Sequence, residues 1–319
     1  MKPTRDILAR LERGGHILLD GGTGSELQRR GVNVSKGVSA DGALGAWSAT
    51  AMEDAPDVVR AIHEDYLRVG ADVITANSYN ANRGQLGRVG LADRMEEFSR
   101  LAVEIARGAR DRLAPDGFVA GAIAPTTRFP GGWDPKRVAP TAELLREWSD
   151  QVAVLAEAGA DLILIESMSA VFQLMPAVEA AMTSGLRVFL GIHAKSAGTM
   201  SSGETMEQLV AALKTEGRHV DAILLMCSAP EAISATLPTL RAAFAGPIGA
   251  YANVGYHRGS QPPRYPESQY HVIDIGENTP SRYAEYGRQW RDMGAQVLGG
   301  CCGTNPEHIA ALRPVVKGP

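Results

Sequence analysis

Short runs of apolar residues recur along the chain, and each is followed by a segment whose apolar positions have helical spacing. The runs are continuous rather than alternating, which is typical of parallel strands buried on both faces. We predict a strand in each run, at residues 16–20, 72–77, 118–125, 161–166, 187–193, 222–227, 247–253 and 296–300.

Apolar residues between these runs recur every three or four positions, which predicts amphipathic helices. The clearest stripes consist of Val58, Val59, Ile62, Tyr66 and Val69, of Leu144, Trp148, Val152 and Leu155, and of Leu209, Val210 and Leu213. Asn305 followed by Pro306 predicts an N-cap with proline at the first helical position, so a last helix starts there. Pro176 interrupts residues 171–182 and predicts a helix that is kinked or begins late.

The repeated strand–helix unit predicts an α/β fold, a single (β/α)8 TIM barrel that occupies residues 1–319 as one domain. The same alternation also permits a doubly wound open sheet. Three connections, at 32–55, 126–140 and 254–278, are longer than a barrel needs. Long loops on the catalytic face serve as lids, specificity loops or contacts between subunits, so we expect one of these roles for each.

Polar residues and thiols gather at the carboxyl ends of the predicted strands. In a barrel the active site lies on that face. The residues at these ends are Asp20, Asn77, Glu166, His193, Cys227, Asn253, Cys301 and Cys302. This pattern predicts an enzyme. A lone histidine such as His193 is more often a hydrogen-bonded core residue than a ligand. The chain contains no His-x-His or His-Glu-x-x-His motif, which argues against a histidine metal site.

All the cysteine in the chain lies at two strand ends, as Cys227 and as the adjacent pair Cys301 and Cys302. Three thiolates with an open fourth position form a catalytic rather than a structural zinc site. Neighbouring strand residues point to opposite faces, so both members of the pair reach one ion only beyond the strand end. The alternatives are three buried apolar cysteines, or a strained disulfide between neighbours.

The composition sets limits on the class of protein. The chain has 319 residues, of which 45% are hydrophobic and 21% charged, with a net charge of −4. With no lysine or arginine run beyond pairs, we expect neither a nucleic-acid partner nor binding to an anionic membrane. No apolar run approaches a membrane span and no signal-peptide core is present, so we expect a cytoplasmic protein with reduced thiols. A homo-oligomer is left open.

Four segments carry a resemblance to a known family. Residues 299–304, with Pro306 and His308 beyond them, resemble the terminal motif of the zinc-dependent homocysteine S-methyltransferases. Residues 20–27 resemble the first motif of that family, and residues 70–79 resemble its second. Residues 159–167 resemble its central glutamate motif. The motifs span most of the chain in the family's order. The family includes S-methylmethionine– and betaine–homocysteine methyltransferases.

The resemblance implies an enzyme that moves a methyl group from a sulfonium or ammonium donor to the thiol of homocysteine, giving methionine. It implies a Zn2+ cofactor, with Cys227, Cys301 and Cys302 as metal ligands and catalytic residues. A thiol bound to zinc is deprotonated near neutral pH and can attack a methyl group. Two alternatives stay open: the same fold acting on another thiol or methylated donor, and a non-catalytic zinc- or thiol-binding barrel.

The amino-acid end of homocysteine needs its own anchors. The resemblance implies contacts from Glu166 and from the first glycine motif, where Gly21 and Gly22 can offer backbone N–H groups to a carboxylate. Asp20 and Glu166 are candidates for binding the ammonium group; their alternative roles are a buried ion pair or a helix cap. A glycine turn of this kind can also simply join a strand to a helix. Asn77 and Asn253 are further candidates for substrate binding or orientation.

A cationic donor favours aromatic walls through cation–π attraction. The candidates near the catalytic face are Trp47, Tyr79, Trp133, Tyr251 and Tyr256, each of which can also serve only in packing. The chain departs from better-known members of the family at residues 191–195 and 251–256. Because both segments end strands near the predicted site, a substrate other than the family's usual one stays open.

Overall fold

The computed structural model describes residues 6–36, 45–125, 140–195, 198–258 and 271–318. Its main sheet contains eight parallel strands in the order β1-β11-β8-β7-β5-β4-β3-β2, and a bridge between Leu19 and Val73 joins the two ends of that order. The strands are β1 (Ile17–Leu18), β2 (Val73–Thr75), β3 (Phe118–Ile123), β4 (Leu162–Met168), β5 (Arg187–Lys195), β7 (Ala222–Met226), β8 (Ile248–Ala252) and β11 (Ala295–Gly300). The barrel prediction is therefore confirmed, and the open-sheet alternative is wrong.

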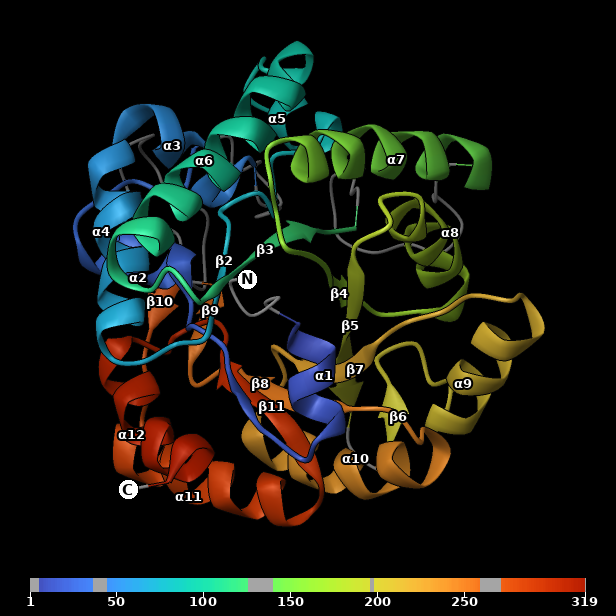
Figure 1. The fold of residues 1–319 in the computed structure, drawn as a ribbon. Helices are drawn as coiled ribbons and strands as arrows, with labels where there is room; N and C mark the ends of the chain where they lie inside the picture. Colours follow the sequence, from blue (N-terminus) through green and yellow to red (C-terminus); the bar gives the residue numbers. More distant parts are fainter. Residues whose placement is uncertain (1–5, 37–44, 126–139, 196–197, 259–270, 319) are drawn as a thin grey trace, which may run out of the picture.

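Helices surround the strands on the outside of the barrel (Figure 1). They are α2 (Thr23–Arg29), α4 (Pro56–Arg68), α6 (Met95–Leu113), α7 (Thr141–Glu157), α8 (Val171–Met182), α9 (Met206–Thr215), α10 (Pro230–Ala243), α11 (Pro280–Asp292) and α12 (Pro306–Lys317). Asn305 caps α12, since its side chain accepts a hydrogen bond from the His308 N–H, as predicted. The late start predicted for the helix with Pro176 is wrong, because α8 begins at Val171 and runs through the proline.

The apolar core has two parts, which the alternation along each strand separates. In β4, Leu162 and Leu164 point into the barrel, whereas Ile163 and Ile165 pack against the helices. Helix α1 (Ile7–Glu12) lies over one end of the barrel in Figure 1, and its Ile7 and Leu11 join the inner cluster. Apolar side chains therefore fill the barrel interior, and the polar groups lie at its opposite end.

Several short helices and strands lie in the loops. The first long connection contains η1 (Trp47–Thr50) and α3 (Ala51–Asp54), and the last contains an antiparallel pair, β9 (Tyr256–Arg258) with β10 (His271–Ile273). Of the predicted loop at 126–140, residues 126–139 lie outside the described residues. Strand β6 (Thr199–Met200) pairs with the end of β5, and α5 (Arg83–Gly87) and η2 (Ala92–Arg94) follow β2. In the described part of the chain, no helix is long and apolar enough to span a membrane.

Candidate active site

A cavity of about 530 Å³ opens at the carboxyl ends of the barrel strands. Its wall contains all the candidate residues from the sequence: Asp20, Gly21, Gly22, Asn77, Glu166, His193, Cys227, Asn253, Cys301 and Cys302. Residues from the ends of seven strands, separated by up to 282 positions in the chain, thus meet in one place. His193 is half-buried and faces this cavity, although the sequence favoured a core role for it.

The three cysteines form one cluster. Their sulfur atoms all lie within 4.8 Å of one another, and those of Cys301 and Cys302 are 3.9 Å apart. A tetrahedral zinc ion with Zn–S bonds of about 2.3 Å needs sulfur atoms roughly 3.8 Å apart. The cluster therefore fits a zinc ion that has three protein ligands and one position open to the cavity.

The backbone brings the three thiols together by leaving the strand conformation. Strand β11 ends at Gly300, so Cys301 and Cys302 both lie beyond it, as their adjacency requires. Cys227 directly follows β7 and has a φ of 46°, which is uncommon for a residue with a side chain. Its N–H donates to the Tyr251 carbonyl at 2.9 Å, which anchors this turn to the neighbouring strand.

The thiols perturb one another's acidity. The pKa of Cys227 is lowered well below its ordinary value, because the thiols of Cys301 and Cys302 donate hydrogen bonds to its sulfur. The pKa values of Cys301 and Cys302 are raised, because the thiol of each donates a hydrogen bond to the Cys227 sulfur. One thiolate is therefore stable in this cluster, and further deprotonation calls for a cation.

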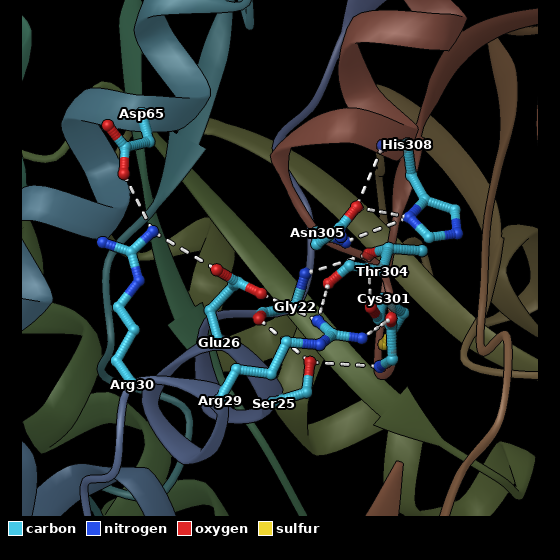
Figure 2. A network of polar contacts seen from close by, with 11 residues as sticks. Gly22, Ser25, Glu26, Arg29, Arg30, Asp65, Cys301, Thr304, Asn305 and His308 are labelled. Atoms are coloured by element: carbon cyan, nitrogen blue, oxygen red, sulfur yellow. Dashed lines mark hydrogen bonds and ion pairs between the residues drawn. The ribbon is translucent and has the colours of Figure 1, made fainter. Parts of the chain in front are cut away.

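A hydroxyl group ties the cysteine loop to the glycine turn after β1 (Figure 2). Thr304 is fully buried; its Oγ1 accepts a hydrogen bond from the Gly22 N–H at 3.1 Å and donates to the Cys301 carbonyl at 2.6 Å. A Cβ at Gly22 would lie 2.5 Å from that carbonyl oxygen, so the close approach requires glycine. The Gly22 N–H donates to Thr304 here, so the predicted contact of Gly22 with a substrate stays a prediction.

Ser25 and Arg29, both in α2, hold the same loop from the other side (Figure 2). The Ser25 hydroxyl donates to the Gly22 carbonyl and accepts from the Gly303 N–H, each at 3.1 Å. The Arg29 guanidinium donates to the carbonyls of Gly303 and Thr304 and pairs with Glu26 at 2.8 Å. The first and last motifs of the sequence therefore form one rigid unit beneath Cys301.

Two buried carboxyl groups face the cavity. Asp20 accepts from the N–H of Thr75 at 2.7 Å and from its hydroxyl at 3.0 Å. Glu166 accepts from the Tyr251 hydroxyl at 3.2 Å. Burial raises the pKa of Asp20 to about 7 and that of Glu166 to about 8. Among the described residues, neither forms an ion pair or caps a helix, so both suit a cationic group of a ligand.

The amides of Asn77 and Asn253 bind backbone next to aromatic side chains. Asn77 accepts from the Ser48 hydroxyl and donates to the Ser48 carbonyl, both at 2.7 Å. Asn253 accepts from the Tyr256 N–H and donates to the Tyr256 carbonyl, both at 2.9 Å. Each amide thus fixes the position of an aromatic ring, that of Trp47 beside Ser48 or that of Tyr256.

Three aromatic rings form one side of the cavity; we call Trp47, Tyr79 and Tyr256 the aromatic wall. The Trp47 indole N–H donates to the Tyr256 hydroxyl at 3.0 Å, and the Trp47 and Tyr79 rings meet edge to face at 6.0 Å. The Tyr256 ring also stacks on His271 with centroids 4.9 Å apart. Trp47 has a φ of 45°, a costly conformation that often marks functional sites. The candidate Trp133 lies outside the described residues.

Sequence reasoning missed the residues that orient the site. Thr75 holds Asp20, Thr304 and Ser25 hold the cysteine loop, and the Tyr251 hydroxyl binds Glu166. Thr75 and Thr304 lie within the motifs quoted above, so their position was a usable signal. Tyr251 was considered only as a ring for a cationic donor.

Comparisons with known proteins agree over almost the whole chain. Residues 17–316 match the family model of homocysteine S-methyltransferase. Homocysteine S-methyltransferase 4 from Zea mays is 28% identical, over 96% of this chain and 91% of that protein. Methionine synthase from Mycobacterium leprae is 30% identical, over 83% of this chain but only 22% of its own length.

A solved structure shares the architecture. The metallated form of the homocysteine methyltransferase MmuM from Escherichia coli superposes with a TM-score of 0.78 at 25% identity. The match covers 96% of this chain and 98% of that one.

Proposed function

The chain belongs to the homocysteine S-methyltransferase family, and from this premise we propose that it methylates the thiol of homocysteine at a zinc ion held by Cys227, Cys301 and Cys302. The product is methionine. The observation that carries the proposal is the group of three sulfur atoms within 4.8 Å of one another in the wall of the cavity. Zinc bound there supplies a Lewis acid that lowers the pKa of a substrate thiol.

The two buried carboxyl groups bind the ammonium group of homocysteine in this proposal. Asp20 and Glu166 lie in the same cavity wall as the thiols, and a cation beside them favours their ionised forms. Gly21, in the turn that joins β1 to α2 and in the cavity wall, offers its backbone N–H to the substrate carboxylate. The ammonium and thiol ends of the substrate are thus held by different strands.

The methyl donor is a sulfonium or quaternary ammonium compound, and the aromatic wall receives its positive charge. Cation–π attraction to aromatic rings contributes about 0.5–2 kcal/mol in such sites. The sulfur of homocysteine forms a new bond to the methyl carbon as the bond from that carbon to the donor breaks. The electron pair of the broken bond stays on the donor, which leaves neutral, and the thiol proton goes to solvent.

The protein acts in this proposal as one barrel domain over residues 1–319, in the cytoplasm, and contributes to methionine biosynthesis. Cys301 and Cys302, with sulfur atoms 3.9 Å apart, work as ligands only while they are reduced. A reducing compartment keeps them so.

Mass spectrometry of the products tests this function. Zinc-loaded, reduced protein is incubated with homocysteine and, in separate samples, with S-methylmethionine, S-adenosylmethionine or betaine. We expect methionine from a sulfonium or ammonium donor, and none from the Cys301→Ala variant. If the wild-type protein forms no methionine from any of the three donors, the proposed reaction is wrong.

A further inference from the structure

Tyr251 places a phenol hydroxyl inside the barrel beside the proposed ammonium site. It lies in β8, is 3% exposed and belongs to the inner apolar cluster. Its hydroxyl lies 3.2 Å from Oε1 of Glu166 and 3.4 Å from the sulfur of Met226. Burial raises the pKa of Tyr251 well above its ordinary value, so the hydroxyl keeps its proton and is the donor.

The space for this hydroxyl depends on a glycine in β5. A Cβ at Gly191 would lie 2.4 Å from the Tyr251 oxygen and 3.0 Å from the Met226 sulfur. Any side chain at that position would therefore push the hydroxyl away from Glu166. Gly191 in β5 and Tyr251 in β8 thus fit together inside the barrel.

The backbone beside Glu166 is held by the same group of residues. Ser167 has a φ of 60°, and its N–H donates to the Met226 sulfur at 2.8 Å. The register between β4 and β5 shifts between Ile165 and Met168, so Glu166 lies where β4 leaves regular geometry. Its carboxylate has no regular strand to orient it and depends on side-chain contacts.

We propose that Tyr251 is a positioning residue for the acceptor: its hydroxyl, seated in the space left by Gly191, fixes the Glu166 carboxylate in the orientation that receives the ammonium group of homocysteine. This inference rests on the proposed function. The terminal torsion of a glutamate side chain is broad, so an unrestrained carboxylate turns freely. A carboxylate has about four lone-pair sites, so one bond to Tyr251 leaves others for the substrate.

A packing role alone makes a different prediction. If Tyr251 only fills the barrel interior, loss of its hydroxyl changes stability and affects every ligand equally. If it positions Glu166, the loss affects only ligands that carry an ammonium group. The pair homocysteine and 4-mercaptobutanoate, which is homocysteine without its amino group, separates the two.

Calorimetric titration of the zinc-loaded Tyr251→Phe variant with both thiols tests the proposal. A hydrogen bond to a charged group is strong, so we expect the homocysteine Kd to rise roughly 10-fold. The Kd of 4-mercaptobutanoate should stay within about 2-fold of wild type, since it has no group for Glu166. Zinc content, measured on the same samples, should remain at the wild-type value.

Tyr283→Phe is the matched control, because it removes a buried hydroxyl that bonds to Ala252 and Gly299 but not to Glu166. We expect it to change the two Kd values by the same factor.

The outcomes separate this inference from the proposed function. An equal change for both thiols in Tyr251→Phe, or an unchanged homocysteine Kd, would overturn the positioning role. A wild-type protein that binds zinc but not homocysteine would instead overturn the proposed function.

Discussion

Substitution of Thr304 by valine removes one hydroxyl from a fully buried position and keeps the shape of the side chain. The hydroxyl joins the Gly22 N–H to the Cys301 carbonyl, at 3.1 and 2.6 Å. The carbonyl keeps a second bond, from the Thr304 N–H at 3.2 Å. The main loss is therefore the partner of the buried Gly22 N–H.

An unsatisfied buried donor costs about 2 kcal/mol. In a chain of this length, that lowers Tm by about 3 °C. The larger expected effect is on zinc, because the hydroxyl orients the backbone that carries Cys301. Groups that orient metal ligands change metal affinity by about 10- to 100-fold, so we expect the zinc Kd of Thr304→Val to rise within that range.

Competition with a chromophoric chelator measures the zinc Kd, and thermal unfolding of the same samples measures Tm. Thr304→Ser is the control, because it keeps the hydroxyl and should bind zinc as tightly as wild type. A Thr304→Val variant with lowered Tm but wild-type zinc affinity would show that the hydroxyl stabilises the fold without positioning the ligand.

Two further substitutions test the acids and the aromatic wall. Burial raises the pKa of Glu166 from 4.5 to about 8 in the folded, metal-free protein. As pH rises, Glu166 therefore ionises in the unfolded chain before it ionises in the folded protein. The wild type should lose stability between about pH 4.5 and pH 8. Glu166→Gln avoids this loss, so the Tm of the variant relative to wild type should rise between about pH 5 and 8. Parallel Tm curves would refute the raised pKa of Glu166. In activity assays the homocysteine KM of this variant should rise while its zinc content stays normal. A Cβ at Gly24 would lie 2.3 Å from the Trp47 ring, so Gly24→Ala should displace the aromatic wall and raise the donor KM by about 2- to 30-fold. Steady-state kinetics with each substrate varied in turn measure both KM values. A rise in the homocysteine KM instead of the donor KM would contradict the assignment of the aromatic wall to the donor.

The barrel was predictable because its strands are buried on both faces. A run such as Leu162–Ile163–Leu164–Ile165 serves the interior and the helix layer at once, so it reads as an uninterrupted apolar segment. Helix α1 was missed because it has only six residues and buries just Ile7 and Leu11, too few to show a period.

The metal ligands were predictable for a different reason. A barrel collects its strand ends, so Cys227 and Cys301 could be placed together without distances. The contacts of the orienting groups could not be predicted, even where the residues lie within the motifs, because they join residues far apart in the sequence. The bond from Gly22 to Thr304 spans 282 positions, and the fit of Tyr251 against Gly191 depends on side-chain directions inside the barrel.

Removal and return of the metal test the role of the three thiolates most directly. Methionine formation is measured in reduced protein before chelation, after chelation and after stepwise addition of zinc. We expect activity to disappear with the metal and to return in proportion to zinc, up to about one ion per chain, in wild type but not in Cys301→Ala. Full activity in the metal-free protein would contradict a zinc site formed by Cys227, Cys301 and Cys302.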